Sequence, residues 1–408
     1  MRTLLSLLIT FLVPLPAQAD GAPRGPVARL HDLLHSCHTA LAGSADDAPD
    51  QGEATLWRLV GHLRAGDPAA AERSLPTRAP WAVVGAAALA QTLGRPPLAA
   101  TILQDFAAEL ERSPEPDDRS FATAARCVQA HLSLAELAEA SARLGHEPPG
   151  QLPSPDDQRA LASGALAELE REAWQPGLGW YRARRCAGEL LLPDEADPAT
   201  LLPFALSAFW SHDARLRQHE ERVLARTLAQ PGGRGTQGLD TAARQLATAV
   251  ILGDDAARER AFSRLQAALP MSSNEAVPAA TAGLVLDALV YAVTGASVWP
   301  RPAANAWIEL RPWLPPGERS VQLPVLVDGA RFTLQLRATP QHTAFKLART
   351  DAGTEPRLVV VRGATWPTIR LMHAGEDCRG SLPRAQADAH DDLHPSGSLD
   401  DRPVGRRR

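Results

Sequence analysis

Apolar positions along the first two thirds of the chain recur with the spacing of amphipathic helices. In the first such segment, five apolar residues fall at i, i+3, i+4, i+7 and i+11, namely Leu30, Leu33, Leu34, Cys37 and Leu41. The same pattern, bounded by Gly, Pro and Asp, predicts further helices at 56–63, 81–93, 98–110, 121–131, 132–144, 154–174, 200–210, 213–228, 236–252, 255–269 and 274–293. Short connections between so many helices are typical of antiparallel helical hairpins.

The hydrophobic period changes to two after Trp299. This alternation predicts strands at 321–323, 325–327, 331–337, 344–349 and 357–362. Asp328-Gly329 between two of them is typical of a β-hairpin turn. The pattern therefore predicts a helical-hairpin domain at 20–298, an antiparallel β module at 299–376 and a polar, disordered tail at 377–408.

Residues 1–19 have the pattern of an export signal. Arg2 precedes the apolar run 4–13, and Ala17-Gln18-Ala19 forms a cleavage site of the A-x-A type. No second long apolar segment follows in the sequence, so we expect a periplasmic or secreted protein that is not held in a membrane once the signal is removed. The formal net charge of −5 gives no indication of nucleic-acid binding.

The chain has four cysteines, Cys37, Cys127, Cys186 and Cys378. An even number in an oxidising compartment permits disulfides, and a bond between Cys37 and Cys127 would join the first predicted helix to the fifth. The alternative is that these residues are buried thiols. Their wide spacing is not that of a zinc site, in which paired ligands stand close together in the sequence.

We expect no metal site and no other cofactor. His31 and His35 stand at i and i+4 on one helix face, a spacing that zinc sites use, but the leucine stripe accounts for this helix without a metal. The sequence contains neither an H-E-x-x-H motif nor a phosphate-binding glycine loop.

Several features of the second half of the chain follow one another in a recognisable order. They are the segments 197–203, 232–233, 245–254, 273–278, 282–290, 294–295 and 307–315. In order and spacing they resemble the six-hairpin glycosidase superfamily, the (α/α)6 toroids of glucoamylase-like enzymes. The resemblance implies a mainly α fold in which helical hairpins form an (α/α)6-like toroid, complete or incomplete, followed by a small antiparallel β domain.

The same resemblance implies positions for a catalytic pair. In that superfamily the general acid lies between the fifth and sixth helices and the general base between the eleventh and twelfth. The last predicted connection holds Glu275, which is the candidate base. The predicted junction of the fifth and sixth helices, near His131, carries no carboxylate, and the candidate acids are Glu115 and Asp117 in the preceding polar loop. The alternatives are a Glu275 that only opens the last helix, where the helix dipole favours an acid, and a solvated turn at 113–118.

A second candidate site is the irregular segment that follows Gly179. Trp180 and Tyr181 are suited to stack on a pyranose ring, and Arg182 and Asp194 to hydrogen-bond its hydroxyl groups. Nine Trp against two Tyr in the chain fit either a sugar-stacking surface or ordinary filling of the core.

Together these observations predict an exported carbohydrate-active protein that resembles six-hairpin glycosidases. It is either a glycoside hydrolase or a degenerate relative that only binds glycans, and its expected partner is an oligosaccharide or another glycan. The alternative is a non-enzymatic α-solenoid scaffold that mediates protein–protein interaction in the periplasm. A toroid brings its first and last helices together, whereas a solenoid leaves them at opposite ends. The sequence leaves the oligomeric state open.

Overall fold

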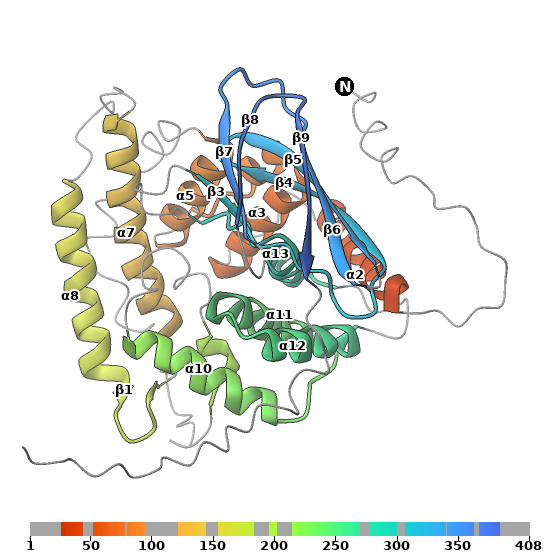
Figure 1. Cartoon of the computed structure of the whole chain (residues 1–408). Coiled ribbons are helices and arrows are strands. Elements are labelled where there is room, and N and C mark those ends of the chain that lie inside the picture. Colours follow the sequence, from red (N-terminus) through yellow and green to blue (C-terminus); the bar gives the residue numbers. More distant parts are fainter. Residues whose placement is uncertain are drawn as a thin grey trace, which may run out of the picture.

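Figure 1 shows the arrangement of helices and strands in the computed structural model. The structure describes residues 26–43, 52–77, 80–94, 121–143, 154–182, 196–201, 214–269, 277–299, 307–339, 341–362 and 367–383. The predicted signal at 1–19 lies outside them, as does the end of the predicted tail, 384–408. None of the described helices is long and apolar enough to cross a membrane.

Helical hairpins make up the N-terminal part of the fold. The described helices are α2 (Pro26–Ala42), α3 (Glu53–Ala65), α4 (Pro68–Arg73), α5 (Trp81–Leu93), α7 (Phe121–Arg143), α8 (Pro155–Ala173), α10 (Ala214–Ala229), α11 (Gly235–Leu252), α12 (Asp255–Ala268) and α13 (Ala279–Thr294), with a short 3-10 turn η1 at Pro198–Thr200. Helices α5 and α13 are apolar all round and buried on almost every side, whereas α8, α10 and α12 keep a polar, exposed face. Of the described helices, α3, α5, α7, α11 and α13 form the inside of the arrangement, and α8, α10 and α12 lie on its outside.

The last inner helix packs directly against the first one. A β-carbon on Gly283 of α13 would lie 1.9 Å from the carbonyl oxygen of Trp57, and one on Gly61 of α3 would lie 2.7 Å from the Gly283 Cα. One turn further along, Arg64 of α3 bonds Asp287 of α13. The residue numbers rise together along both helices, so the two helices run in the same direction. The chain closes into a ring, as the toroid prediction requires, and the first and last hairpins are not at opposite ends as in a solenoid.

The C-terminal part is a small β domain of two sheets. One sheet is antiparallel, in the order β4 (Ser320–Val327), β5 (Ala330–Ala338), β6 (His342–Arg349) and β9 (Asp377–Pro383). The other contains β3 (Ile308–Leu310), β7 (Arg357–Val361) and β8 (Thr368–Met372). Alternate side chains of both sheets share one core, which includes Leu310, Phe332, Leu347 and Val359.

The β domain covers the end of the ring at which the inner helices finish. Backbone N–H groups of Arg311 and Trp313 donate to the carbonyls of Thr294 and Val293, at 2.8 and 2.9 Å, at the end of α13. At the end of α5, Gly329 N donates to Thr92 O at 2.9 Å. The opposite end of the ring, where the inner helices begin, does not carry this domain (Figure 1).

The predicted Asp328-Gly329 turn is confirmed. Both residues have positive φ, 49° and 73°, which a two-residue turn of type I′ needs, and Val327 pairs with Ala330 across it. The main-chain donation from this turn to α5 is reinforced by a hydrogen bond from the Gln91 side chain to Asp328.

Three sequence predictions need correction. The predicted helices 121–131 and 132–144 are one helix, α7, because neither Gly nor Pro interrupts the chain near His131. Strand β9 continues the sheet to Pro383, so the boundary placed at 376 is too early, and the predicted tail at 377–408 begins with ordered sheet. Cys378 and Leu382 in this strand are buried, which supplies the apolar contact that its polar composition concealed.

Two further details concern the β module and the cysteines. The β module is not wholly antiparallel, since β3 pairs with β7 in parallel. Of the cysteines, Cys37 and Cys127 are buried and no disulfide joins them, and Cys378 is also a buried thiol. Cys186 lies outside the described residues.

Replacing Gly283 tests the ring closure. Gly283→Ala places a methyl group against the Trp57 carbonyl, so α3 and α13 must separate, and we expect the free energy of unfolding to fall by about 1–3 kcal/mol or more. The matched control is Gly164→Ala in α8, where nothing lies within 4 Å of the added carbon, and which should stabilise by about 0.5–1 kcal/mol. Urea unfolding of both variants gives the comparison, and equal effects would contradict the close contact.

Glu318, in the loop before β4, makes stability depend on pH. Its side chain is buried, which raises its pKa to about 7 against a smaller opposing effect of the Leu30 backbone N–H. The folded protein therefore holds this proton more tightly than an unfolded chain, whose glutamate pKa is about 4.3, and stability is lost as the pH rises from there to about 7.

Glu318→Gln removes this ionisation. We expect the free energy of unfolding of Glu318→Gln, relative to that of the unaltered protein, to increase by about 1–2 kcal/mol between pH 5 and pH 8. Thermal unfolding at both pH values measures the change, with the exposed Glu72→Gln as control. A difference between the two proteins that is the same at both pH values would show that Glu318 does not titrate in this range.

Candidate functional site

The inner helices α3, α5, α7, α11 and α13 begin at one end of the ring. Glu53 and Trp81 are the first residues of α3 and α5, and Arg126 lies near the start of α7. Asp240 and Arg244 are the sixth and tenth residues of α11, one turn apart on the same face. We call Glu53, Arg126, Asp240 and Arg244 the ring-end cluster. Trp57, Trp81 and Trp299 lie around Arg126 and are called the three indoles.

Glu53 is held as an ionised carboxylate. Its Oε1 accepts from Arg244 Nη2 at 2.8 Å and from Trp57 Nε1 at 3.2 Å. Burial alone would raise its pKa, but the charges of Arg244 and Arg126 and these two hydrogen bonds outweigh it and lower the pKa to about 2. The side chain remains 31% exposed, so this carboxylate is not sealed inside the protein.

The contact between Glu53 and Arg244 joins helices that are 191 positions apart in sequence. Gly52, which precedes α3, permits it. Its φ of 61° is in the left-handed region, and a β-carbon there would lie 2.7 Å from the Trp81 ring. A glycine is therefore needed for α3 to begin directly beside the indole of α5.

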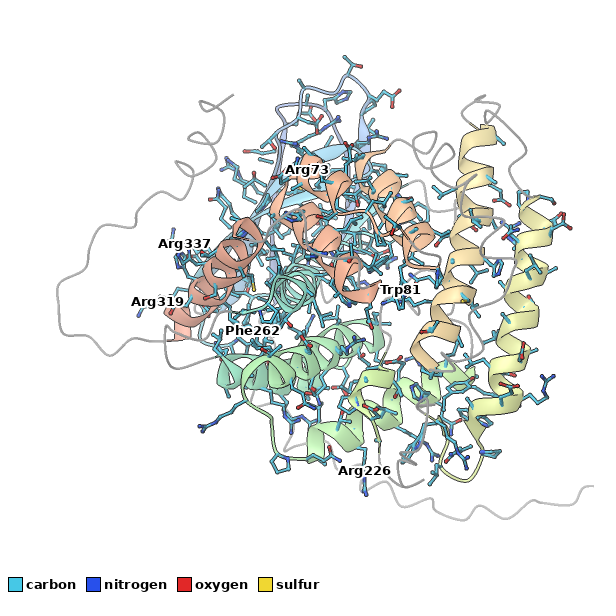
Figure 2. All side chains as sticks on the ribbon, turned by 180° about the vertical axis from the view of Figure 1, so that it is seen from behind. Arg73, Trp81, Arg226, Phe262, Arg319 and Arg337 are labelled. Atoms are coloured by element: carbon cyan, nitrogen blue, oxygen red, sulfur yellow. The ribbon has the colours of Figure 1, made fainter. Side chains whose placement is uncertain are left out.

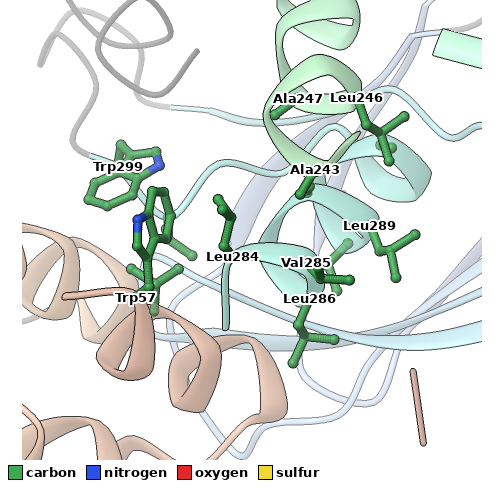
Figure 3. Close-up of a cluster of buried hydrophobic side chains, with 14 of the residues drawn as sticks. Trp57, Ala243, Leu246, Ala247, Leu284, Val285, Leu286, Leu289 and Trp299 are labelled. Carbon is green, nitrogen blue, oxygen red and sulfur yellow. The ribbon is translucent and has the colours of Figure 1, made fainter. Parts of the chain in front are cut away.

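Arg126 is enclosed by the three indoles. Its guanidinium carbon lies 5.6 Å from the ring centres of Trp57 and Trp299 and 5.9 Å from that of Trp81. Figure 3 shows Trp57 and Trp299 next to each other, and their ring centres are 6.1 Å apart in an edge-to-face arrangement. Trp81, labelled in Figure 2, is the half-buried member of the three and lies on the side of α5 that faces α7.

Burial lowers the pKa of Arg126 to about 10, with Glu53 and Asp287 acting in the opposite direction and Arg244 in the same one. Arg126 therefore carries its charge at neutral pH. Its Nη1 donates to Gln129 Oε1 at 2.5 Å, while Nε and Nη2 have no hydrogen-bond partner.

Asp240 differs from Glu53 in its protonation. Burial raises its pKa, and the Glu53 charge adds to this effect, whereas a hydrogen bond from Thr281 and the charge of Arg244 oppose it. Its Oδ1 has no hydrogen-bond partner. One carboxylate of the cluster is thus shifted toward the ionised form and its neighbour toward the protonated form, the combination that acid–base catalysis uses.

A second ion pair lies deeper between α3 and α13. Arg64 Nε donates to Asp287 Oδ1 at 2.6 Å and Arg64 Nη2 to Ala296 O at 2.8 Å. Both side chains are almost fully buried, at 4% and 0% exposure, and they are paired with each other. This pair joins α3 to α13 and is not part of the ring-end cluster.

A shallow pocket flanks α11 on another face of the same helix. It is lined by the 231–233 turn, Gly238, Gln245 and Arg264, among others, with about 310 Å³ of empty space that includes open solvent. The Arg264 guanidinium is already hydrogen-bonded to the protein there, because Nη1 donates to Thr227 O at 2.9 Å and Nη2 to Leu228 O at 2.7 Å.

The predicted sugar-binding aromatics form a short hairpin beside this end of the ring. Trp180 and Tyr181 make β2 (Trp180–Tyr181), which pairs with β1 (Trp174–Gln175). Tyr181 is buried, and its ring centre lies 5.1 Å from Phe121, 4.9 Å from Trp174 and 5.4 Å from His219. Its predicted role as a stacking surface is therefore wrong for this arrangement, because other rings already cover it.

The other members of that prediction are placed as follows. Trp180 is half-buried and packs against the main helical core, and Arg182 is exposed. His219 links the hairpin to α10, since its Nδ1 accepts from Tyr181 N and its Nε2 contacts Thr200 O, each at 3.1 Å. Burial lowers the His219 pKa to about 4, against an opposing effect of the Thr200 carbonyl.

Glu115, Asp117, Asp194 and Glu275 lie outside the described residues. The alternative explanation of Glu275 is nevertheless changed, because α13 begins at Ala279 with Pro278 as its N-cap. Among the described residues, no group of three or more His, Cys, Asp or Glu is suited to hold a metal ion. His31 and His35 stack on each other with ring centres 6.3 Å apart.

The sequence contained signals for the ring-end cluster that the patterns above do not use. Glu53 with Trp57, and Asp240 with Arg244, stand at i and i+4 near the starts of apolar helices. Either pair alone is an ordinary feature of a helix surface. Only the closure of the ring makes them neighbours.

No protein-family model matches the chain, and no curated protein matches it in sequence. Solved structures of similar fold include an α-L-rhamnosidase of Streptomyces avermitilis complexed with L-rhamnose, with a TM-score of 0.57 and 10% identity over 88% of this chain and 42% of that one. A native α-L-rhamnosidase of Aspergillus terreus has a TM-score of 0.54 and 11% identity over 88% of this chain and 50% of that one.

The chain has the fold of the six-hairpin toroids. It is mainly α, with a toroid of helical hairpins followed by a small β domain. It spans half or less of the length of these two rhamnosidases. At this level of identity the likeness concerns the fold.

Carboxyl titration tests the electrostatics of the cluster. With ¹³C-labelled Asp, and Asp240→Asn to assign the signal, we expect Asp240 to titrate above the usual aspartate range. Glu53→Gln should lower its midpoint, because a neighbouring negative charge is removed, and Arg244→Gln should raise it. A midpoint that neither substitution moves would show that Asp240 does not interact with the other charges.

Proposed function

We propose that this protein is an exported glycoside-processing protein whose sugar site is the end of the toroid at which the inner helices begin. The ring-end cluster is the observation that carries the proposal. It combines an ionised carboxylate, a carboxylate with a raised pKa, two guanidinium groups and a half-buried indole in one place. Glycoside hydrolysis requires two carboxyl groups in opposite protonation states, and indole rings are suited to stack on sugar rings.

The short helix α4, which the sequence pattern did not predict, changes where a catalytic acid is expected. When α4 and the predicted helix 98–110 are both counted, α7 is the sixth helix of the ring, and Glu115 and Asp117 stand in the connection that leads into it. Glu275 stands in the connection that leads into α13, the last helix. Both positions that the six-hairpin resemblance implies then lead into inner helices that begin at the ring-end cluster.

We therefore assign the base to Glu275 and the acid to Asp117 or Glu115, and we assign to Glu53 and Asp240 the binding and polarisation of the sugar. Asp240 is the alternative acid, because its raised pKa is suited to proton donation. α-L-Rhamnosides are the first substrates to be tested, since the two structural neighbours named above are α-L-rhamnosidases. Export to the periplasm or the medium, with residues 1–19 as the signal, completes the proposal.

Substitution of the proposed base tests catalysis. A panel of α-L-rhamnosides, other aryl glycosides and oligosaccharides is assayed for release and for binding with the unaltered protein and with Glu275→Gln. We expect turnover to fall by about a thousandfold or more while the dissociation constant changes little, because the charge of a base acts mainly in the transition state. Asp117→Asn, Glu115→Gln and Asp240→Asn, assayed in the same way, identify the acid.

The control is Glu221→Gln, an exposed carboxylate of α10 that pairs with Arg217 at 2.9 Å. Turnover that is the same in Glu275→Gln and Glu221→Gln would remove Glu275 from the mechanism. Binding without release in the unaltered protein would leave a glycan-binding relative that has lost catalysis. Absence of both binding and release over the whole panel would contradict the proposed function.

A further inference from the structure

We propose that the ring-end cluster recognises a carboxylate on its saccharide, so that the ligand of this protein is an acidic glycan containing uronic acid, held by Arg126. The inference deepens the proposed function, because it rests on the same end of the toroid being the sugar site. It adds the chemical class of the ligand and the residue that selects it.

Arg126 has hydrogen-bonding capacity that the protein does not use. The residue is 0% exposed, yet its Nε and Nη2 groups have no acceptor. Buried polar groups in folded proteins are nearly always hydrogen-bonded, and an unpaired buried charge is costly. The three indoles offer their rings to the cation but no strong acceptor, so they do not satisfy these N–H groups.

The unused N–H groups have the geometry that a carboxylate requires. Nε and Nη2 form one edge of the planar guanidinium and point their hydrogens in nearly parallel directions. A carboxylate accepts both in a bidentate arrangement, whereas a neutral hydroxyl group accepts one. A hydroxyl group would therefore leave one donor of Arg126 unpaired.

The carboxylates near Arg126 are already paired with other guanidinium groups. Arg64 is paired with Asp287, and Arg244 with Glu53. Arg126 donates to neither carboxylate, since its Nη1 bonds Gln129 and its Nε and Nη2 have no partner. An incoming carboxylate would therefore be the first anion hydrogen-bonded to Arg126.

The dipoles of the inner helices also favour a bound anion at this end of the ring. The first turns of α3, α5, α7, α11 and α13 carry the positive ends of their dipoles, and all of them lie at this end of the ring. A negative group near the beginning of a helix is stabilised, and several helix starts together add to the effect. A helix start alone would not identify a site, but here it coincides with a buried guanidinium that lacks two acceptors.

Calorimetric titration of the full chain tests the inference. The probes are oligosaccharides of glucuronate and galacturonate, the matched neutral oligosaccharides of glucose and galactose, L-rhamnose, and inorganic phosphate as a non-sugar anion. We expect the acidic oligosaccharides to bind at least about tenfold more tightly than their neutral counterparts, which is the usual difference for one hydrogen bond to a charged group. Phosphate should compete only weakly, because it offers no sugar ring to the indole of Trp81.

Two substitutions locate the selectivity. Arg126→Met keeps the length of the side chain but removes its charge and donors, and it should abolish the preference for acidic ligands. Arg126→Lys keeps the charge without the paired donors and should retain part of it. The matched control is Arg215→Met, because Arg215 also lies over an indole, 5.8 Å from the ring centre of Trp174, but on the exposed surface of α10.

Tryptophan fluorescence of the unaltered protein provides a readout that does not depend on folding of the variants. Three indoles contact Arg126, so an acidic oligosaccharide that binds there should change the emission, and a neutral one should change it less. This measurement decides the matter if Arg126→Met does not fold.

The outcomes separate the two proposals. Equal affinity for acidic and neutral oligosaccharides, or a preference for acidic ones that Arg126→Met leaves unchanged, overturns the carboxylate inference and leaves the sugar site standing. Phosphate that binds as tightly as the acidic sugars also overturns it and indicates a general anion site. Failure of every saccharide to bind contradicts both proposals.

Discussion

The structure depends on the close contact between α3 and α13. These helices are more than 200 positions apart in sequence, and Arg64 meets Asp287 across a separation of 223 residues. The backbones approach closely because two glycines, Gly61 and Gly283, face each other where any β-carbon would collide. The buried carboxylate of Asp287 then needs a cation, since an unpaired charge at 0% exposure would be very costly. Close approach and charge pairing together hold the first and last hairpins as neighbours.

Ring closure makes the two ends of the toroid chemically different. Since α3 and α13 run in the same direction, the helix ends that carry free carbonyl groups gather on one side, and the β domain supplies donors to them from Arg311, Trp313 and Gly329. The opposite end gathers helix starts, whose N–H groups and dipoles favour negative charge. Glu53 and Asp240 lie there, and their different environments shift their pKa values in opposite directions. Helix direction therefore distinguishes the end of the ring that the β domain covers from the end at which the charged cluster lies.

Local patterns in the sequence predict the elements better than they predict the site. The leucine stripe that begins at Leu30 and the Asp328-Gly329 turn are read correctly because each depends on residues close in sequence. Strand β9 is missed because its apolar residues, Cys378 and Leu382, are few, and its partner β6 stabilises it from about 35 positions away. The error in α7 has another cause, since a break was placed where the sequence contains no helix breaker.

The ring-end cluster is beyond local prediction for a physical reason. Glu53 meets Arg244 across 191 positions, and each side chain taken alone is a charged residue on a helix. Their significance arises from tertiary contact, and so does the burial that shifts their pKa values. Tyr181 shows the opposite limit. An aromatic residue in an irregular segment favours a ligand contact, whereas Phe121, Trp174 and His219 enclose it.

The energetics of Arg126 support the proposal that the ring-end cluster binds a ligand. Contacts with indole rings contribute about 0.5–2 kcal/mol each when the cation is desolvated. The effective cost of burying a guanidinium is several kcal/mol, and two unpaired donors add about 1–3 kcal/mol each. An apolar side chain between the same indoles would avoid both costs, as replacements of buried charges in other proteins show. A buried guanidinium with two unpaired donors, placed among the starts of five helices, therefore supports the proposal that Arg126 takes part in binding a ligand.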